Sequence, residues 1–269
     1  MKYHTVLTIA GSDSGGGAGI QADIKTISAC GCYAASAITA VTVQNTLGVE
    51  AIHPVPADIV RGQIRAVLTD IGADAVKIGM LHAAEIVDCI SEELQDFHGS
   101  IVLDPVMVST SGHRLIEEQA IETLTKRLMP MARVITPNIP EAELLLASRL
   151  QSQDELYTAA PRLAEMFGVS VLLKAGHLVG ETLIDIFYDY EQGTLSELPS
   201  QRVHTVNTHG TGCTLSSAMA SMLAHGLPLT DAAYAAKRYI AEAIAAGADY
   251  TIGHGHGPVN HFYAFRKPS

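Results

Sequence analysis

The chain has few positive charges and no long apolar run. Its 269 residues include 17 Lys and Arg against 28 Asp and Glu, which gives a formal net charge of −11. This balance argues against nucleic acid or an anionic membrane surface as the main partner, although local backbone dipoles still allow an anionic substrate. No apolar stretch approaches the roughly 18 residues that a membrane span needs. The sequence therefore predicts neither a nucleic-acid-binding protein nor a membrane protein.

Sulfur motifs, processing signals and linkers are also missing. The four cysteines, Cys30, Cys32, Cys89 and Cys213, have no CxxC or zinc-like spacing, so reduced thiols in a cytoplasmic protein are expected. The first three of them are interpreted as packing residues. Residues 1–11 show no signal-peptide pattern. Because no repeat, low-complexity block or linker-like run appears, residues 1–269 are expected to form one domain.

Short apolar runs alternate with amphipathic runs along the chain. Strands are expected at Val6–Ala10, Tyr33–Gln44, Val49–Val55, Ala75–Ile78, Ile101–Leu103, Val134–Thr136, Val169–Lys174, Ile184–Tyr190 and Thr194–Leu198. Helices are expected from Ile20 to Gly31, Asp58 (as cap) to Asp70, Ala83–Phe97, Leu115–Leu128, Pro140–Ala147, Asp154–Phe167, 213–225 and Thr230–Ala246. This order favours an α/β fold with helices on both faces of a mostly parallel sheet.

A glycine-rich loop at 11–19 connects the first expected strand to the first expected helix. It matches neither familiar nucleotide fingerprint, because no Lys-Ser/Thr follows the glycines and Ile20 breaks the G-x-G-x-x-G spacing. One interpretation is a ligand-binding turn, and the other is a tight turn that needs glycine only for its backbone. Asp13 is a residue of the kind that orders such a turn through its side chain.

A second glycine-rich stretch, 207–214, opens directly into a helix. Free backbone N–H groups and the positive end of the helix dipole converge at such a point and form an anion site. The glycines also let the backbone approach a ligand closely. The stretch alone fits a structural turn before a core helix equally well.

Polar side chains gather where the expected strands end. Ligands in open parallel sheets lie beyond the carboxyl ends of the strands. Those ends are Gly11, Gln44, Met80, Asp104, Asn138 and Lys174, with Glu141 close behind Asn138. Each of these residues alone could have a purely structural role. That all of them fall at expected strand ends is not expected by chance. The set provides two carboxylates, a lysine, two amides and an anion site at one edge.

This set suits phosphoryl transfer, which depends on positioning and charge neutralisation. Asp104 and Glu141 could hold a hard cation, directly or through its waters, while Lys174 neutralises phosphate oxygens. The amides of residues 210–213 could stabilise the transferring group, and losing one such donor typically costs ~3 kcal/mol. Cys213 has a reference pKa of about 8.5, which a helix N-terminus is expected to lower, so its thiolate is a candidate general base.

Several of these segments resemble one kinase family closely. They are residues 8–23, Gln44-Asn45-Thr46, Lys77-Ile78-Gly79-Met80, Asp104-Pro105-Val106-Met107, Thr136-Pro137-Asn138 with Glu141, His209-Gly210-Thr211-Gly212-Cys213-Thr214, and the glycine- and histidine-rich tail at 253–258. Over nearly the whole chain the sequence is similar to the hydroxymethylpyrimidine and phosphomethylpyrimidine kinases of thiamine biosynthesis, within the ribokinase-like superfamily.

The resemblance implies a ribokinase-like three-layer α/β/α sandwich and a homodimer. It also implies that ATP and Mg²⁺ are used to phosphorylate 4-amino-5-hydroxymethyl-2-methylpyrimidine and then its monophosphate. The implied pyrimidine contacts are Gly11, Ala18, Asp23, Gln44, Met80 and Val106. The implied Mg-ATP contacts are Asp104, Asn138, Glu141, Lys174 and Thr211, with Mg²⁺ at Asp104 and Glu141. Gly210, Thr211 and Gly212 would form the anion hole. Cys213 would act where sugar kinases carry an Asp base, and the tail would close over the site.

Two other functions remain open at this point. A pyridoxal kinase of the same fold also phosphorylates a hydroxymethyl group on a flat nitrogen heterocycle, although Gln44 and Met80 favour the pyrimidine. A non-catalytic pyrimidine sensor would need no phosphate machinery. The spacing of His254 and His256 suggests a metal, but no third ligand is evident.

Overall fold

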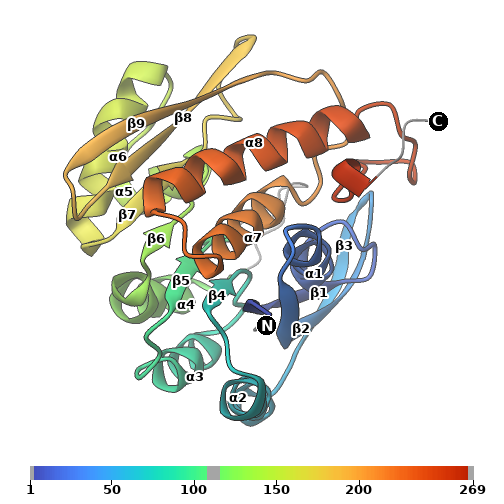
Figure 1. Cartoon of the computed structure of the whole chain (residues 1–269), viewed down its shortest axis with the longest axis vertical. Helices are drawn as coiled ribbons and strands as arrows, with labels where there is room; N and C mark the ends of the chain where they lie inside the picture. The colour runs from blue at the N-terminus through green and yellow to red at the C-terminus, as the bar shows by residue number, and fades with distance from the viewer. Residues whose placement is uncertain (1–2, 108–115, 266–269) are drawn as a thin grey trace.

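The computed structural model describes residues 3–107 and 116–265. Their strands form one nine-stranded sheet in the order β3-β2-β1-β4-β5-β6-β7-β8-β9. The strands from β2 to β7 run parallel to their neighbours, whereas β3, β8 and β9 are antiparallel additions at the two edges. Helices cover both faces of the sheet (Figure 1). The predicted mostly parallel α/β/α arrangement is confirmed.

The expected strands are all present. Their bounds are β1 Thr5–Asp13, β2 Tyr33–Asn45, β3 Gly48–Pro54, β4 Ala75–Ile78, β5 Ser100–Leu103, β6 Val134–Ile135, β7 Ser170–Leu173, β8 Thr182–Asp189 and β9 Thr194–Gln201. The main difference concerns β1, which was expected to end at Ala10. It continues to Asp13 because β2 keeps pairing with it, after a register shift between Ala10 and Ser12. This extension carries Asp13 beyond the edge of the shorter central strands.

The helices also follow the expected order. Their bounds are α1 Gly19–Ala29, α2 Ala57–Ala66, α3 Ala84–Glu93, α4 Glu118–Thr123, α5 Ile139–Leu146, α6 Gln153–Phe167, α7 Thr211–Ala224 and α8 Leu229–Gly247. Two π-helical turns, Val67–Ile71 and Leu124–Leu128, continue α2 and α4. Short 3₁₀ turns lie at Met129–Met131 and Tyr263–Phe265. Among the described residues, no helix combines the length and apolar character required to cross a membrane.

Three details of the helix predictions were wrong or untestable. Asp58 is not the cap of α2, because Pro56 occupies that position and Asp58 lies in the first turn. The helix expected to reach Phe97 ends at Glu93. Leu115, where the next helix was expected to begin, lies outside the described residues, and α4 begins at Glu118.

Alternating side chains of the strands supply two separate cores. Leu7 and Ile9 of β1 pack with α2, α3, α4, α5 and α6, whereas Val6 packs with α1, α7 and α8 on the other face. Figure 1 shows α8 and α7 stacked across that second face. Because the strands alternate their side chains between two buried faces, the sheet holds the carboxyl ends of its parallel strands in one fixed row.

Candidate active site

A cavity of about 520 Å³ lies along the carboxyl edge of the parallel strands. Its walls come from the turns after β1, β4, β5, β6 and β7, from the far part of β2, and from the start of α7. The residues expected to form a site are therefore brought together. Those that line the cavity are Gly11, Ala18, Gln44, Met80, Asp104, Val106, Asn138, Glu141, Lys174, Gly210, Thr211, Gly212 and Cys213.

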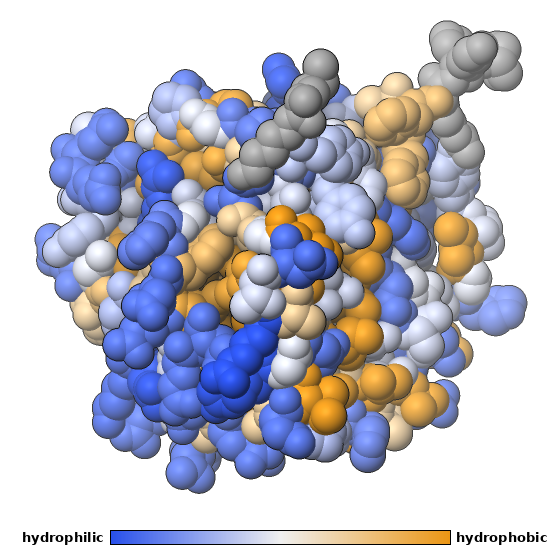
Figure 2. Space-filling model, turned by 60° about the horizontal axis from the view of Figure 1, so that its bottom comes forward, coloured by the Kyte–Doolittle hydropathy of each residue, from blue (hydrophilic) through white to orange (hydrophobic). Residues whose placement is uncertain are grey.

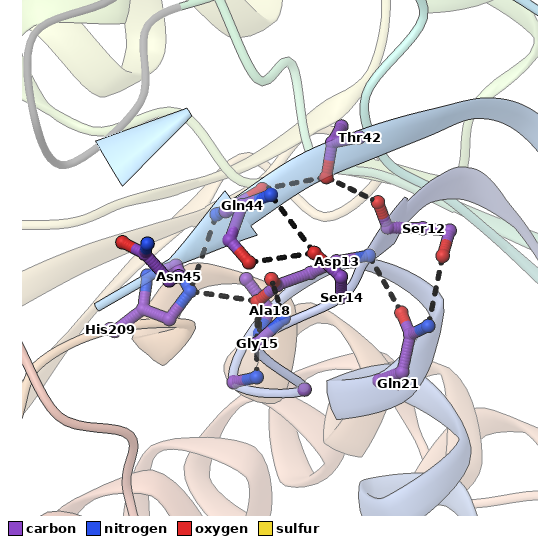
Figure 3. A network of polar contacts seen from close by, with 12 residues as sticks. Ser12, Asp13, Ser14, Gly15, Ala18, Gln21, Thr42, Gln44, Asn45 and His209 are labelled. Carbon is purple, nitrogen blue, oxygen red and sulfur yellow. Dashed lines mark hydrogen bonds and ion pairs between the residues drawn. The ribbon is translucent and has the colours of Figure 1, made fainter. Parts of the chain in front are cut away.

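Asp13 organises the turn between β1 and α1. Its Oδ1 accepts a hydrogen bond from the Gly15 amide at 2.8 Å. Its Oδ2 accepts from the amides of Gly17 at 3.0 Å and Ala18 at 2.8 Å, and lies 2.8 Å from His209 Nε2 (Figure 3). Burial opposes ionisation of Asp13, but these donors outweigh it and lower the pKa of the carboxyl. The predicted ordering of the turn by this side chain is confirmed.

The two glycine-rich loops interlock at their backbones. Gly210, at the N-cap of α7, has φ +78°, and a Cβ there would clash with the Gly17 carbonyl oxygen. Only glycine combines that left-handed conformation with so close an approach. No side chain caps α7. The Thr211 amide donates to the Thr208 carbonyl at 3.4 Å, and the other first-turn amides are left for a ligand in the cavity.

A buried ion pair lies against the start of α7. Lys174 Nζ donates to Asp104 Oδ1 at 2.9 Å, and Thr136 Oγ1 donates to the same oxygen at 3.0 Å. A Cβ on Gly212 would lie 3.3 Å from both Asp104 Oδ2 and Lys174 Nζ. Burial disfavours the charged lysine, but Asp104 and Glu141 outweigh it and raise the pKa of Lys174. A permanent positive charge therefore faces the anion site.

Glu141 lies in a capping box at the start of α5. Its backbone N–H donates to Asn138 Oδ1 at 2.9 Å, while the Asn138 N–H donates to Glu141 Oε2 at 2.7 Å. Burial raises the pKa of Glu141 to about 7, although Lys174 opposes this shift. Glu141 and Asp104 both line the cavity.

Two carboxylates, those of Asp104 and Glu141, are enough for Mg²⁺. They are too few for a metal that is bound entirely by protein side chains. Within residues 3–107 and 116–265, no cluster of three or more His, Cys, Asp or Glu side chains could hold a metal ion. Magnesium usually keeps several waters and takes only one or two carboxylates, with phosphate oxygens completing its shell. A nearby cation would also favour the ionised form of Glu141.

The environment of Cys213 corrects one prediction. A lowered pKa was expected from its place at a helix N-terminus. Burial instead raises the pKa of the thiol to about 11, and Asp23 and Asp104 add to this increase. Lys77 and the Gly19 amide oppose it without reversing it. Desolvation therefore outweighs the helix dipole, and the thiol is protonated near neutral pH.

Comparison with known proteins decides the family. The sequence profile described as phosphomethylpyrimidine kinase matches residues 13–260. The chain belongs to this family. A hydroxymethylpyrimidine/phosphomethylpyrimidine kinase of Rhizobium meliloti is 48% identical over 262 residues, which cover 97% of this chain and 98% of that protein. The family is one of phosphotransferases, so the predicted enzyme class is confirmed.

Solved structures agree with this family and with the ribokinase-like fold. Phosphomethylpyrimidine kinase from Clostridium difficile 630 aligns with a TM-score of 0.79 at 44% identity, over 90% of this chain and 99% of that chain. The ADP complex of Bacillus subtilis pyridoxal kinase aligns with a TM-score of 0.90 at 34% identity, over 99% and 100% of the two chains.

Asp23 does not line the cavity of this phosphomethylpyrimidine kinase family member. The side chain is fully buried, and its Oδ2 accepts from Thr8 Oγ1 at 2.6 Å and Lys77 Nζ at 2.9 Å. Ser217 Oγ donates to its Oδ1 at 2.7 Å. Both carboxylate oxygens therefore accept hydrogen bonds from protein donors, and the expected role of Asp23 as an acceptor for the pyrimidine stays a prediction.

Sequence reasoning missed two buried lysines. Lys77, inside the short strand β4, is the partner of Asp23, and a lysine in a buried strand was itself a signal that a carboxylate must lie beside it. Lys237 of α8 donates to Asp185 Oδ2 of β8 at 2.6 Å, and both residues line the far end of the cavity. No motif in the sequence marked this second pair.

The C-terminal tail, which was expected to close over the site, contacts the β2–β3 turn and the loop before α7. The His256 amide donates to the Thr46 carbonyl at 2.9 Å, and the His209 amide donates to the Gly257 carbonyl at 3.0 Å. The tail therefore joins the β2–β3 turn to the loop before α7, at one end of the cavity. His254 and His256 belong to no metal-binding cluster among the described residues.

Proposed function

We propose that the protein phosphorylates 4-amino-5-hydroxymethyl-2-methylpyrimidine with ATP and then converts the monophosphate to the diphosphate. The family membership supports this activity. The observation that carries it is the Lys174–Asp104 pair, 2.9 Å apart, packed against Gly212 at the uncapped start of α7. A buried positive charge beside free helix amides suits a transferring phosphoryl group.

The cavity provides two chemically different ends for two substrates. Gln44, Met80 and Val106 form one end, with a single carboxamide between apolar walls, which suits a flat heterocycle. The other end lies among Val203, Ile240 and side chains of β8 and α8, where apolar residues stand beside the Lys237–Asp185 pair. The anion site at α7 lies between the two ends, so we assign the heterocycle to the first and the nucleotide base to the second.

The amides of Gly210, Thr211 and Gly212 would stabilise the negative charge that develops on the transferring group. Lys174 would neutralise the phosphate oxygens, and Asn138 would hold Glu141 in place through the capping box. Magnesium, when bound, would supply positive charge that offsets the negative charge of the phosphate groups. We propose that Asp104 and Glu141 hold it, through water molecules where they do not touch it directly.

Cys213 is proposed as the group that takes the hydroxymethyl proton. Its thiolate would accept that proton as the alkoxide oxygen bonds to the γ-phosphorus of ATP. The bond from phosphorus to the oxygen that it shares with the β-phosphate breaks, and ADP leaves with both bonding electrons. Because the thiol has a pKa of about 11, this step would accelerate as the pH rises toward that value.

A homodimer in the cytoplasm is proposed from the family resemblance. Exposed apolar side chains support a self-contact, among them Val41, Val43 and Leu47 on and beyond β2. Figure 2 shows apolar residues gathered toward the right side of one face, while its lower left side is mainly hydrophilic. Analytical ultracentrifugation would test the dimer, and a sedimentation coefficient of a 28.5 kDa monomer at micromolar concentration would contradict it.

The likeness to pyridoxal kinase supports a second candidate function. Both acceptors carry a hydroxymethyl group on a flat ring, and the volume of about 520 Å³ leaves room for either ring. Coupled measurement of ADP release with each acceptor, at equal concentration and saturating Mg-ATP, separates the two functions. Faster turnover of the pyrimidine is expected. Much faster turnover of pyridoxal would establish the second function instead, and tight pyrimidine binding without ATP consumption would indicate a sensor.

A further inference from the structure

The carboxamide of Gln44 has a protein neighbour at each end. Thr42 Oγ1 lies 3.1 Å from its Oε1, and His209 Nε2 lies 3.4 Å from its Nε2 (Figure 3). All three side chains line the cavity. The oxygen and the NH₂ group of a carboxamide are nearly equal in size. The protons on the neighbouring groups therefore decide which position holds the oxygen and which holds the nitrogen.

The threonine end requires the amide nitrogen. Thr42 has a single hydroxyl proton, and the Ser12 carbonyl oxygen, which can only accept, lies 2.7 Å from its Oγ1. The hydroxyl therefore donates to Ser12 and has only lone pairs left for Gln44. The group of Gln44 that faces Thr42 must then be the NH₂, since two acceptors would repel each other.

The histidine end requires the amide oxygen. The Asp13 carboxylate only accepts hydrogen bonds, and it lies 2.8 Å from His209 Nε2. That nitrogen therefore carries a proton and cannot accept one from the NH₂ of Gln44. Both ends demand the same orientation, in which Nε2 faces Thr42 and Oε1 faces His209.

We propose that Thr42 and His209, held by Ser12 and Asp13, lock the Gln44 carboxamide in this orientation and thereby select the acceptor. The proposal rests on the proposed function, because it takes Gln44 as the residue that meets the heterocycle. The second N–H and the second lone pair of the carboxamide remain for a ligand. A ring nitrogen beside an amino group complements them, as N3 and the 4-amino group of a 4-aminopyrimidine do.

A pyrimidin-4-one presents the opposite pattern. Its N3–H donates and its 4-oxo group accepts, so it faces the locked carboxamide with like groups. The oxo compound could restore the match by turning over, but its 5-hydroxymethyl group would then point away from α7. With the lock removed, the carboxamide itself could turn over and accept the oxo compound. The preference of the enzyme for the amino compound over the oxo compound therefore shows whether the Gln44 carboxamide is locked.

The test compares 4-amino-5-hydroxymethyl-2-methylpyrimidine with its 4-oxo analogue as acceptors. The ratio of their kcat/KM values is measured for the wild type, Thr42→Val, Thr42→Ser and His209→Phe. Thr42→Val and His209→Phe should each lower the preference for the amino compound about 10-fold or more, the worth of about one neutral hydrogen bond. Thr42→Ser keeps the hydroxyl and should keep the wild-type ratio. In His209→Phe, Asp13 retains its three backbone donors.

A merely structural role would reduce turnover of both compounds equally and leave the ratio unchanged. An unchanged ratio in both Thr42→Val and His209→Phe overturns the proposal. If the wild type phosphorylates neither pyrimidine, the proposed function fails independently. In that case the Kd values of the same two compounds are measured by calorimetry. Thr42→Val and His209→Phe are then expected to lower the binding preference for the amino compound to the same extent.

Discussion

The environment of Cys213 makes the pH dependence of catalysis a direct test of its role. Burial raises the pKa of the thiol to about 11, with further increases from Asp23 and Asp104 and opposing effects from Lys77 and Gly19. At pH 7.5 only roughly 3 in 10,000 molecules would carry the thiolate, given that pKa. If the thiolate is the base, kcat/KM for the pyrimidine should rise about 10-fold per pH unit from pH 7.5 to 9.5.

A second titrating group can be separated from Cys213 in the same profile. Burial raises the pKa of Glu141 to about 7 and a bound Mg²⁺ would lower it, so any rise that Glu141 contributes should level off by about pH 8. The contribution of Cys213 continues beyond that pH. The Cys213→Ala variant should lose the alkaline slope and about 10²-fold or more in kcat at pH 8.5, with little change in the KM for the pyrimidine.

The assay is initial-rate ADP release at saturating Mg-ATP, with circular dichroism at each pH to show that the protein remains folded. Cys213→Ser is the matched variant that keeps a small polar side chain but has no accessible pKa in this range. A flat wild-type profile above pH 8, or a Cys213→Ala variant that retains the alkaline slope, would refute the role of the thiolate. Cys213 would then be a wall of the cavity only.

Three further outcomes follow from the buried contacts. Lys77→Met should lower the free energy of unfolding by ~3–5 kcal/mol in urea titrations, because it leaves the Asp23 charge buried without its cation. The double variant with Asp23→Leu should recover most of that loss. An equal loss in the double variant would contradict the pairing. Gly210→Ala should cost more than the ~1–2 kcal/mol of left-handed strain alone. Gly168→Ala measures that strain, since both glycines are left-handed but only residue 210 meets neighbouring backbone. Equal melting-temperature losses would contradict the clash. Asp104→Asn should lower kcat by ~10²–10³-fold, while the Kd for the pyrimidine, measured by calorimetry, stays unchanged. A near-normal kcat would show that Asp104 has no role in phosphoryl transfer.

Most of the fold could be predicted because its signals are local. The buried strands are short apolar runs, and turn or capping residues such as Asn138 and Gly168 mark the helix ends. The extension of β1 to Asp13 was not predictable in this way. It depends on pairing with β2 more than twenty residues later, and its sequence of glycine and serine has low intrinsic strand preference.

The candidate site shows the same division between local and long-range signals. Strand ends located Asp104, Asn138 and Lys174 correctly, because topology alone brings the carboxyl ends of parallel strands together. Burial was not available from the sequence, and it accounts for the two places where the structure differs from the expected surroundings of a residue. Asp23 is occupied by three donors from β1, β4 and α7, and desolvation reverses the expected shift in the pKa of Cys213.

The proposed function is tested most directly by the masses of the products. The protein is incubated with ATP, Mg²⁺ and 4-amino-5-hydroxymethyl-2-methylpyrimidine, and the mixture is followed by mass spectrometry, with the Asp104→Asn variant as control. The expected result is a monophosphate that appears first and is then converted to a diphosphate, with one ADP released at each step. An unmodified pyrimidine beside unconsumed ATP, from folded protein that binds both, would contradict the proposed function.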